Sequence, residues 1–358
     1  MIISFDNYAK IRYEVIMQIK QNASIHDFFK RCQLNLLNEH KNDFLGLPIS
    51  KKTELKIQRK MKNAGFQEFY GPEDTWPSLY ISTTDFLKSP YHSNIKLDQI
   101  NDDNFTYSKE QIIADELFNI DSIQLDEKRE LNDWMKLRAL DQSYDSIILW
   151  RNDEVWMLDA PSEANTIDPC AKRATGDVLT YGLGIGYFIY MAMLNSNVKS
   201  ITVIENSQDV IQMFENYLLP QFPKLPLTII HGDAFDYHNK DYLANFDYVF
   251  VDIYQSNRDG LLMIEKLLEQ YNPPIDKIDF WIEDSCLEIL PTLIFDYFYQ
   301  LNYHKANNQD NRSYKSLRKK TANYFRNLDV IIDDAEQIKY YMYDRKTLRA
   351  ILATKKVD

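Results

Sequence analysis

The sequence predicts an α/β protein built on a parallel sheet that helices cover on both faces. From residue 176 onward, short apolar runs alternate with helical patterns, and a cluster of glycines follows the first run. Continuous apolar strands alternating with helices are typical of a parallel sheet buried on both faces. Before residue 143 the patterns are mostly helical, which predicts a mainly helical N-terminal domain. Residues 303–358 are expected to form a helical C-terminal extension.

Length, charge and cysteine content narrow the class of function. The chain has 358 residues, of which 45% are hydrophobic, and its formal net charge is −12. This length suits two hydrophobic cores, and the acidic balance disfavours nucleic acid or an anionic membrane as a partner. The three cysteines are widely spaced and odd in number, so they predict neither a disulfide framework nor a zinc site. No secretory signal is visible, and we expect a cytoplasmic protein without a metal.

Four segments are predicted: a helical domain over 1–142, a β-hairpin and connecting helix over 143–175, the sheet domain over 176–302 and the extension over 303–358. The hairpin is expected from two short strand-like runs on either side of a polar turn. Local capping signals predict the helices of the first segment. The elements expected up to residue 175 are a helix after Ser24, a basic helix at Lys51–Asn63 closed by Gly65, helices after Ser108 and at Glu130–Leu140, strands at Ser146–Trp150 and Glu154–Leu158, and a helix at Pro161–Arg173.

The sheet domain is predicted as alternating strands and helices, which together make a Rossmann-like sheet. Ligands of such sheets bind beyond the carboxyl ends of the strands. The expected strands are Val178–Tyr181, Ile201–Glu205, Leu227–Ile230, Tyr248–Asp252 and Ile278–Glu283, and the expected helices are Tyr187–Leu194, Gln208–Leu218, Leu261–Tyr271 and Leu287–Leu301.

A glycine-rich turn joins the first strand to the first helix. Of the nine glycines in the chain, four are Gly176, Gly182, Gly184 and Gly186. Glycine is used where the backbone needs positive φ or comes close to a ligand. A turn of this kind ahead of a helix exposes backbone N–H groups, which suits a polar or anionic ligand.

Acidic residues stand at the ends of the next strands. Glu205 ends the second strand, 19 residues after Gly186, where a carboxylate can accept hydrogen bonds from ribose hydroxyls. The third strand leads into Asp233 and Ala234, which are suited to the adenine side of a nucleoside. Asp252 ends the fourth strand at the mouth of the expected crevice. Together these residues predict a nucleoside-binding site.

These motifs resemble those of class I S-adenosylmethionine-dependent methyltransferases, and among them the spermidine synthase-like group. The resemblance covers about residues 145–290 and rests on Gly182-Leu-Gly-Ile-Gly186, Glu205, Gly232-Asp233-Ala234 and Val251-Asp252. It implies S-adenosylmethionine as cofactor, with Gly182, Gly184, Gly186, Glu205, Asp233 and Ala234 in its binding site. By the same resemblance Asp233 would contact the adenine amino group, and Asp252 would lie near the transferred group.

The chain departs from the aminopropyltransferases of that group at two places. Their glycine loop carries an aspartate, whereas this chain has Ile185, and Asp252 is followed by Ile253-Tyr-Gln-Ser256 instead of the usual pattern. Methyl transfer is therefore favoured over aminopropyl transfer. A nicotinamide fingerprint fails because Tyr187 stands where glycine or alanine is required.

Two further motifs are interpreted as structural. Asn272-Pro-Pro-Ile275 follows a helix and is interpreted as a loop breaker. The basic run from Arg312 to Arg326 is interpreted as a solvated helix face, with phosphate binding as the alternative.

The predicted function is methyl transfer from S-adenosylmethionine to an unidentified small-molecule acceptor. Asp252 is the candidate for binding or deprotonating the acceptor, with Tyr254 as the second catalytic candidate and Glu283 as a wall residue. Two alternatives stay open: a spermidine synthase-like aminopropyltransferase, and a non-catalytic nucleoside-binding protein. A homodimer is also kept open.

Overall fold

The structure is a computed structural model, and it describes residues 2–3, 47–55, 59, 78, 80–101, 103–119, 124–126, 131–133, 137–303, 314–333 and 335–355. Contacts divide the chain into two compact units. The glycine-loop unit contains residues 21–234 and 245–252, and the C-terminal unit contains residues 1–20, 235–244 and 253–358. The four segment boundaries given above stay predictions.

The glycine-loop unit contains the predicted parallel strands. Four of them are neighbours in the order β13-β12-β11-β14, and each adjacent pair is parallel. Tyr181 is in register with Ile204 and with Val251, and Glu205 is in register with His231, so the carboxyl ends meet at one edge. The α/β prediction is therefore confirmed. The strands are β11 (Gly176–Tyr181), β12 (Val198–Glu205), β13 (Leu227–His231) and β14 (Tyr248–Val251).

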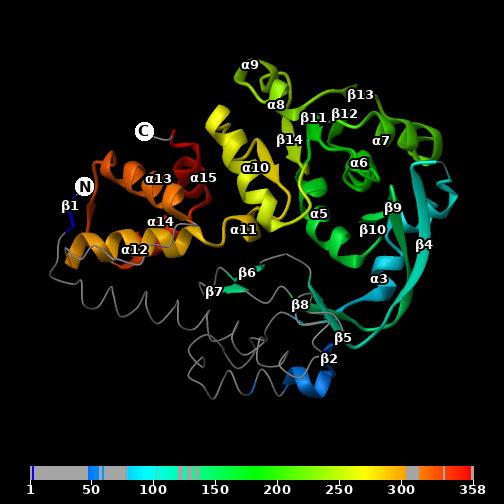
Figure 1. Cartoon of the computed structure of the whole chain (residues 1–358), viewed down its shortest axis with the longest axis horizontal. Helices are drawn as coiled ribbons and strands as arrows, with labels where there is room; N and C mark the ends of the chain where they lie inside the picture. The colour runs from blue at the N-terminus through cyan, green and yellow to red at the C-terminus, as the bar shows by residue number, and fades with distance from the viewer. Residues whose placement is uncertain are drawn as a thin grey trace. The chain divides into compact units, whose positions relative to one another are not determined.

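Helices flank these strands (Figure 1), and the apolar residues that the sequence pattern indicated are buried. All four residues of β14 are buried. Phe188, from the helix after the glycine turn, stacks on Phe250 with ring centroids 4.2 Å apart. The helices are α5 (Pro161–Arg173), α6 (Tyr187–Met193) and α7 (Gln208–Met213), and α7 continues as the π-helical turn η5 (Phe214–Leu218) and the 3-10 turn η6 (Leu219–Gln221).

The predicted hairpin is confirmed as β9 (Tyr144–Arg151) and β10 (Glu154–Leu158), which pair antiparallel. On its other side β9 pairs antiparallel with β4 (Phe105–Ile112) over eight residue pairs. The helix expected after Ser108 is therefore wrong. The Ser108 hydroxyl accepts a hydrogen bond from the indole N–H of Trp150 (2.9 Å). Pairing with a strand distant in sequence has overridden a local capping pattern.

The helix expected at Glu130–Leu140 is also wrong in its described part, where β7 (Leu131–Asp133) and β8 (Leu137–Leu140) form. Of the basic helix expected at Lys51–Asn63, residues 51–55 are helical. Most of its remainder, and the helix expected after Ser24, lie outside the described residues. The other elements of this region are β2 (Leu47–Pro48), β3 (Tyr80–Ile81), α3 (Thr83–Leu87), α4 (Pro90–Asn94), η4 (Leu97–Gln99), β5 (Glu116–Asn119) and β6 (Gln124–Asp126).

The C-terminal unit is mainly helical in its described part, as predicted for the extension. The helices α12 to α15, orange to red in Figure 1, pack against one another. The strand expected at Ile278–Glu283 is shorter than predicted, because the chain turns at Ile282 with φ 43° and a helix begins at Glu283. The elements are β1 (Ile2–Ile3), α9 (Lys240–Leu243), α10 (Asn257–Gln270), β15 (Ile278–Phe280), α11 (Glu283–Cys286), α12 (Leu290–Tyr303), α13 (Lys315–Arg326), β16 (Ile331–Ile332), α14 (Ala335–Tyr343) and α15 (Arg345–Ala353), together with α8 (Ala234–Tyr237), whose first residue is assigned to the glycine-loop unit.

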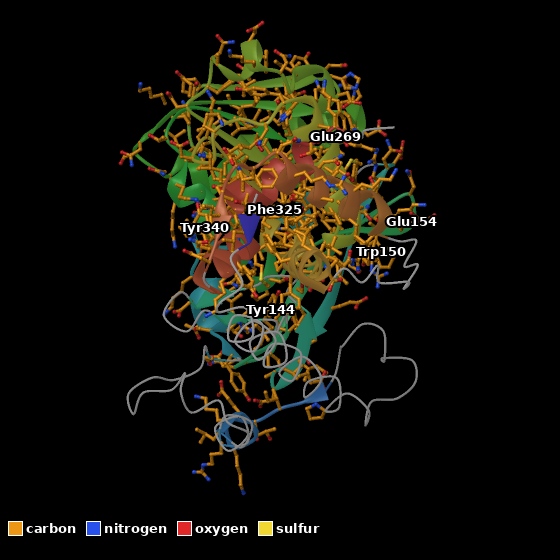
Figure 2. The ribbon with its side chains drawn as sticks, turned by 90° about the vertical axis from the view of Figure 1, so that its left-hand side faces the viewer. Tyr144, Trp150, Glu154, Glu269, Phe325 and Tyr340 are labelled. Carbon is orange, nitrogen blue, oxygen red and sulfur yellow. The ribbon has the colours of Figure 1, made fainter. Side chains whose placement is uncertain are left out.

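The basic helix α13 is only partly a solvated face. Lys320 is 1% exposed, and its ammonium group lies 2.9 Å from a Glu265 carboxylate oxygen and 2.6 Å from one of Glu269. Phe325, labelled in Figure 2, is fully buried against the rings of Tyr297 and Phe298. The interpretation of the whole run as solvated is therefore wrong, because α13 carries part of the core of this unit.

Gly176 gives a first testable prediction. Its φ is +63°, and a Cβ there would lie 1.9 Å from Oδ2 of Asp247, the atom that accepts the N–H of Asp177 (2.9 Å). Gly176→Ala is therefore expected to lower the free energy of unfolding by roughly 2–4 kcal/mol. Thermal melting of this variant beside Thr175→Ala, an exposed neighbour, measures the effect. Equal melting temperatures for the two variants would contradict it.

Candidate functional site

The glycine turn after β11 has the positive φ angles that its sequence suggested. Gly182, Gly184 and Gly186 all have positive φ, at 93°, 50° and 74°. The N–H of Gly186 donates to the carbonyl of Leu183 (2.8 Å), which closes the turn. A Cβ on Gly186 would lie 2.5 Å from the ring of Phe214, so close packing as well as φ requires glycine there.

Glu205 lies against this turn, as predicted. Its side chain is buried, and one carboxylate oxygen accepts the N–H of Leu183 within the turn (2.9 Å). The other oxygen accepts the N–H of Ser207 (2.8 Å), at the start of α7. A carboxylate has about four acceptor positions. Glu205 can therefore fix the turn and still accept hydrogen bonds from a ligand hydroxyl.

Asp252 follows β14 and lines a cavity of about 30 Å³ together with Thr180 and the turn from Gly182 to Gly186. Its N–H donates to the carbonyl of Tyr181 (2.9 Å), which fixes its backbone at the end of the strand. The residue is half-buried, and desolvation raises the pKa of its carboxyl from 3.8 to about 7. Such a group can take up and release a proton near neutral pH. The cavity has room for about one or two water molecules.

Asp233 and Ala234 follow β13, next to the end of β12. The N–H of Gly232 donates to the carbonyl of Glu205 (2.9 Å), so these two strand ends are adjacent. Asp233 is exposed, whereas Ala234 is buried. The parallel register therefore brings the glycine turn, Glu205, Asp233 and Asp252 to the same edge of the strands.

Tyr254 and Glu283 belong to the C-terminal unit, where both take part in packing. The Tyr254 hydroxyl donates to the carbonyl of Trp281, and the ring lies against Gly260. Glu283 is buried and forms two hydrogen bonds with the guanidinium group of Arg349, at 2.6 and 2.7 Å. A catalytic role for Tyr254 and a wall role for Glu283 stay predictions.

Two residues near the turn were not predicted from the sequence. The hydroxyl of Tyr91, in α4, donates to the carbonyl of Ile185 (2.7 Å), and the side chain is buried. Met157, in β10, lines the same cavity as Asp252 and packs on Gly184. No local motif marks either residue, because their contacts with the turn are set by tertiary packing.

The described residues contain no helix long and apolar enough to cross a bilayer. They also contain no group of three or more histidine, cysteine, aspartate or glutamate side chains placed to hold a metal ion.

No protein-family model matches the chain, and no curated protein matches it. Solved structures that match part of this chain include a spermidine synthase from Thermotoga maritima, 13% identical over 38% of this chain and 51% of that protein, with a TM-score of 0.27. A putative methyltransferase complexed with SAH is 15% identical over 39% of this chain and 37% of that protein, with a TM-score of 0.25. A shikimate dehydrogenase from Mycobacterium tuberculosis is 14% identical over 49% and 59%, with a TM-score of 0.23.

This chain covers less than two thirds of each of these proteins. At such scores the similarities carry no argument about activity. The strand order β13-β12-β11-β14 and the parallel register of these strands identify the fold as Rossmann-like.

Proposed function

We propose that the protein is an S-adenosylmethionine-dependent methyltransferase acting on a small-molecule acceptor. One observation carries the proposal: a glycine turn, a buried glutamate and a half-buried aspartate follow three neighbouring parallel strands within one unit. This edge is where Rossmann-like sheets bind nucleosides.

The residues at the edge have the chemistry that an adenosyl group needs. Glu205 has acceptor positions left for ribose hydroxyls, and the exposed Asp233 offers a carboxylate to the adenine amino group. The cavity at Asp252 is much smaller than a nucleoside, so only a small terminal group would enter it. We therefore assign the bulk of the ligand to Glu205 and Asp233 and the acceptor side to Asp252.

Bound S-adenosylmethionine would supply a methyl group already activated by its sulfonium. The task of the chain is then to hold donor and acceptor in line and to exclude water, and positioning alone can supply roughly 7–11 kcal/mol. Asp252 is suited to remove a proton from an amine or hydroxyl acceptor, because burial raises the pKa of its carboxyl to about 7. Glu205 would keep the glycine turn fixed through the N–H of Leu183.

Titration calorimetry with four compounds tests the proposal: S-adenosylmethionine, S-adenosylhomocysteine, decarboxylated S-adenosylmethionine and NAD. The expected result is binding of the first two in preference to the others, followed by a methylated product when acceptor mixtures are supplied. Preference for the decarboxylated donor would indicate aminopropyl transfer. Adenosyl binding without turnover would favour the non-catalytic nucleoside-binding alternative, and preference for NAD would contradict the proposal.

Asp233 gives a sharper prediction about the adenine side. Asp233→Ala is expected to weaken S-adenosylhomocysteine binding about tenfold, the loss of one charge-assisted hydrogen bond. Because the side chain is exposed, the variant is expected to lose less than about 1 kcal/mol of unfolding free energy. Calorimetry with S-inosylhomocysteine, in which a carbonyl oxygen replaces the adenine amino group, is the control, and Asp233→Ala is expected not to weaken its binding. An equal loss for both ligands would contradict the assigned contact.

A further inference from the structure

Met157 covers the middle glycine of the turn. Its sulfur lies 3.2 Å, and its terminal methyl carbon 3.4 Å, from the position that a Cβ on Gly184 would occupy. Both residues line the cavity that contains Asp252. The thioether therefore fills the space into which Gly184 would point a side chain, and a ligand touching the turn there would need that same space.

The hairpin strand is irregular at this point. Val155 pairs with Trp150, but Met157 pairs with Leu149, so the two residues of β10 span only one step of β9. Such a bulge bends a strand and changes the direction of its side chains, and bulges are frequent beside active sites. Val155 is 58% exposed, whereas Met157 is half-buried against the turn. The irregularity thus coincides with the contact between the hairpin and Gly184.

Methionine suits a cover that has to move. Its side chain is unbranched and flexible, with a polarizable sulfur, so it adapts to irregular spaces. The thioether can change rotamer while the backbone of β10 keeps its pairing with β9. A branched residue of similar volume has fewer ways to leave the turn.

We propose that Met157 determines access to the glycine turn, its side chain competing with the ligand for the space over Gly184. This inference rests on the proposed function, because the ligand is taken to be an adenosyl compound. Without ligand, the thioether covers Gly184 and limits water at Asp252. On binding, the side chain moves off the turn, and that displacement lowers the affinity for the ligand.

The test compares Met157→Ala with Val155→Ala, an alanine substitution at the exposed side of the same irregularity. Removing the thioether is expected to increase amide hydrogen exchange in residues 182–186 about tenfold and to tighten S-adenosylhomocysteine binding about threefold to tenfold. Val155→Ala is expected to change neither. Met157→Leu keeps the bulk of the side chain, so amide exchange in the turn and affinity for S-adenosylhomocysteine are expected to stay at or below the wild-type values. This variant is used for the comparison if the alanine variant folds poorly.

The two measurements separate this inference from the proposed function. Weaker S-adenosylhomocysteine binding by Met157→Ala would overturn the competition, because the thioether would then be part of the binding surface. Unchanged exchange in the turn would overturn the covering role, with or without a ligand. If no variant binds an adenosyl compound, the proposed function fails, and faster exchange in Met157→Ala alone would still support the covering role.

Discussion

At pH 8 the Asp252→Asn variant is expected to be more stable than the wild type by about 2–4 kcal/mol. The carboxyl has a pKa of about 7 in the folded chain and 3.8 as its ordinary value. Between these values the folded state holds a proton that the unfolded state has released, so stability falls as pH rises from about 4 to 7. Asparagine keeps the shape of the side chain without the charge. The difference in unfolding free energy between variant and wild type should therefore vanish near pH 4.

Urea unfolding at several pH values measures this effect without knowledge of any acceptor. Asp153→Asn, in the exposed turn between β9 and β10, is the control and should follow the wild-type curve. If the free energies of unfolding of Asp252→Asn and wild type differ by the same amount at every pH from 4 to 8, the pKa of the Asp252 carboxyl is not raised in the folded chain. Once an acceptor is known, Asp252→Asn is expected to lower turnover by about 10²–10⁴-fold, the usual contribution of a general base. Wild-type turnover should rise as pH increases through about 7.

Glu283→Gln is expected to lower the free energy of unfolding by about 3–5 kcal/mol, because it leaves a buried guanidinium group without its countercharge. Arg349 is 1% exposed, and its Nε and a terminal nitrogen donate to the two Glu283 oxygens at 2.6 and 2.7 Å. The same guanidinium group donates to the carbonyl of Ile278 (3.0 Å). Urea unfolding followed by tryptophan fluorescence measures the loss.

Two controls distinguish the effect of breaking a buried ion pair from the effect of breaking a partly exposed one. Asp296→Asn removes a partner of Arg318 at a partly exposed pair in the same unit and should cost less than about 1 kcal/mol. The double variant Glu283→Leu with Arg349→Met replaces both charges by apolar groups and should recover most of the stability. An effect of Glu283→Gln as small as that of Asp296→Asn would contradict the buried pair between Glu283 and Arg349.

The sheet could be predicted from sequence because each of its strands is a short apolar run whose type is set locally. Glu205 was placed beside the glycine turn by the parallel register, which follows from the alternation of strands and helices. Ser108 was misassigned because a capping pattern is local, whereas β4 forms through pairing with β9. Lys320 looked solvated, and its burial depends on glutamates from α10 more than fifty residues earlier.

The site was predicted in part for the same reason. Residues that follow strands could be assigned from position in the chain, and this covers Glu205, Asp233 and Asp252. Tyr91 and Met157 reach the turn from α4 and β10, through contacts that have no sequence periodicity. The raised pKa of Asp252 could not be anticipated either, because it depends on desolvation by surrounding side chains.

The last glycine of the turn would persist in evolution even if binding were lost. Phe214 and Phe222 occupy the space where any Gly186 side chain would begin, so the rings alone would select against every other amino acid at this position. A descendant with no remaining ligand would keep the same glycine pattern. Retention of Gly186 among relatives would therefore report on aromatic packing, whereas retention of Asp233, whose side chain is exposed, would be the better record of an inherited activity.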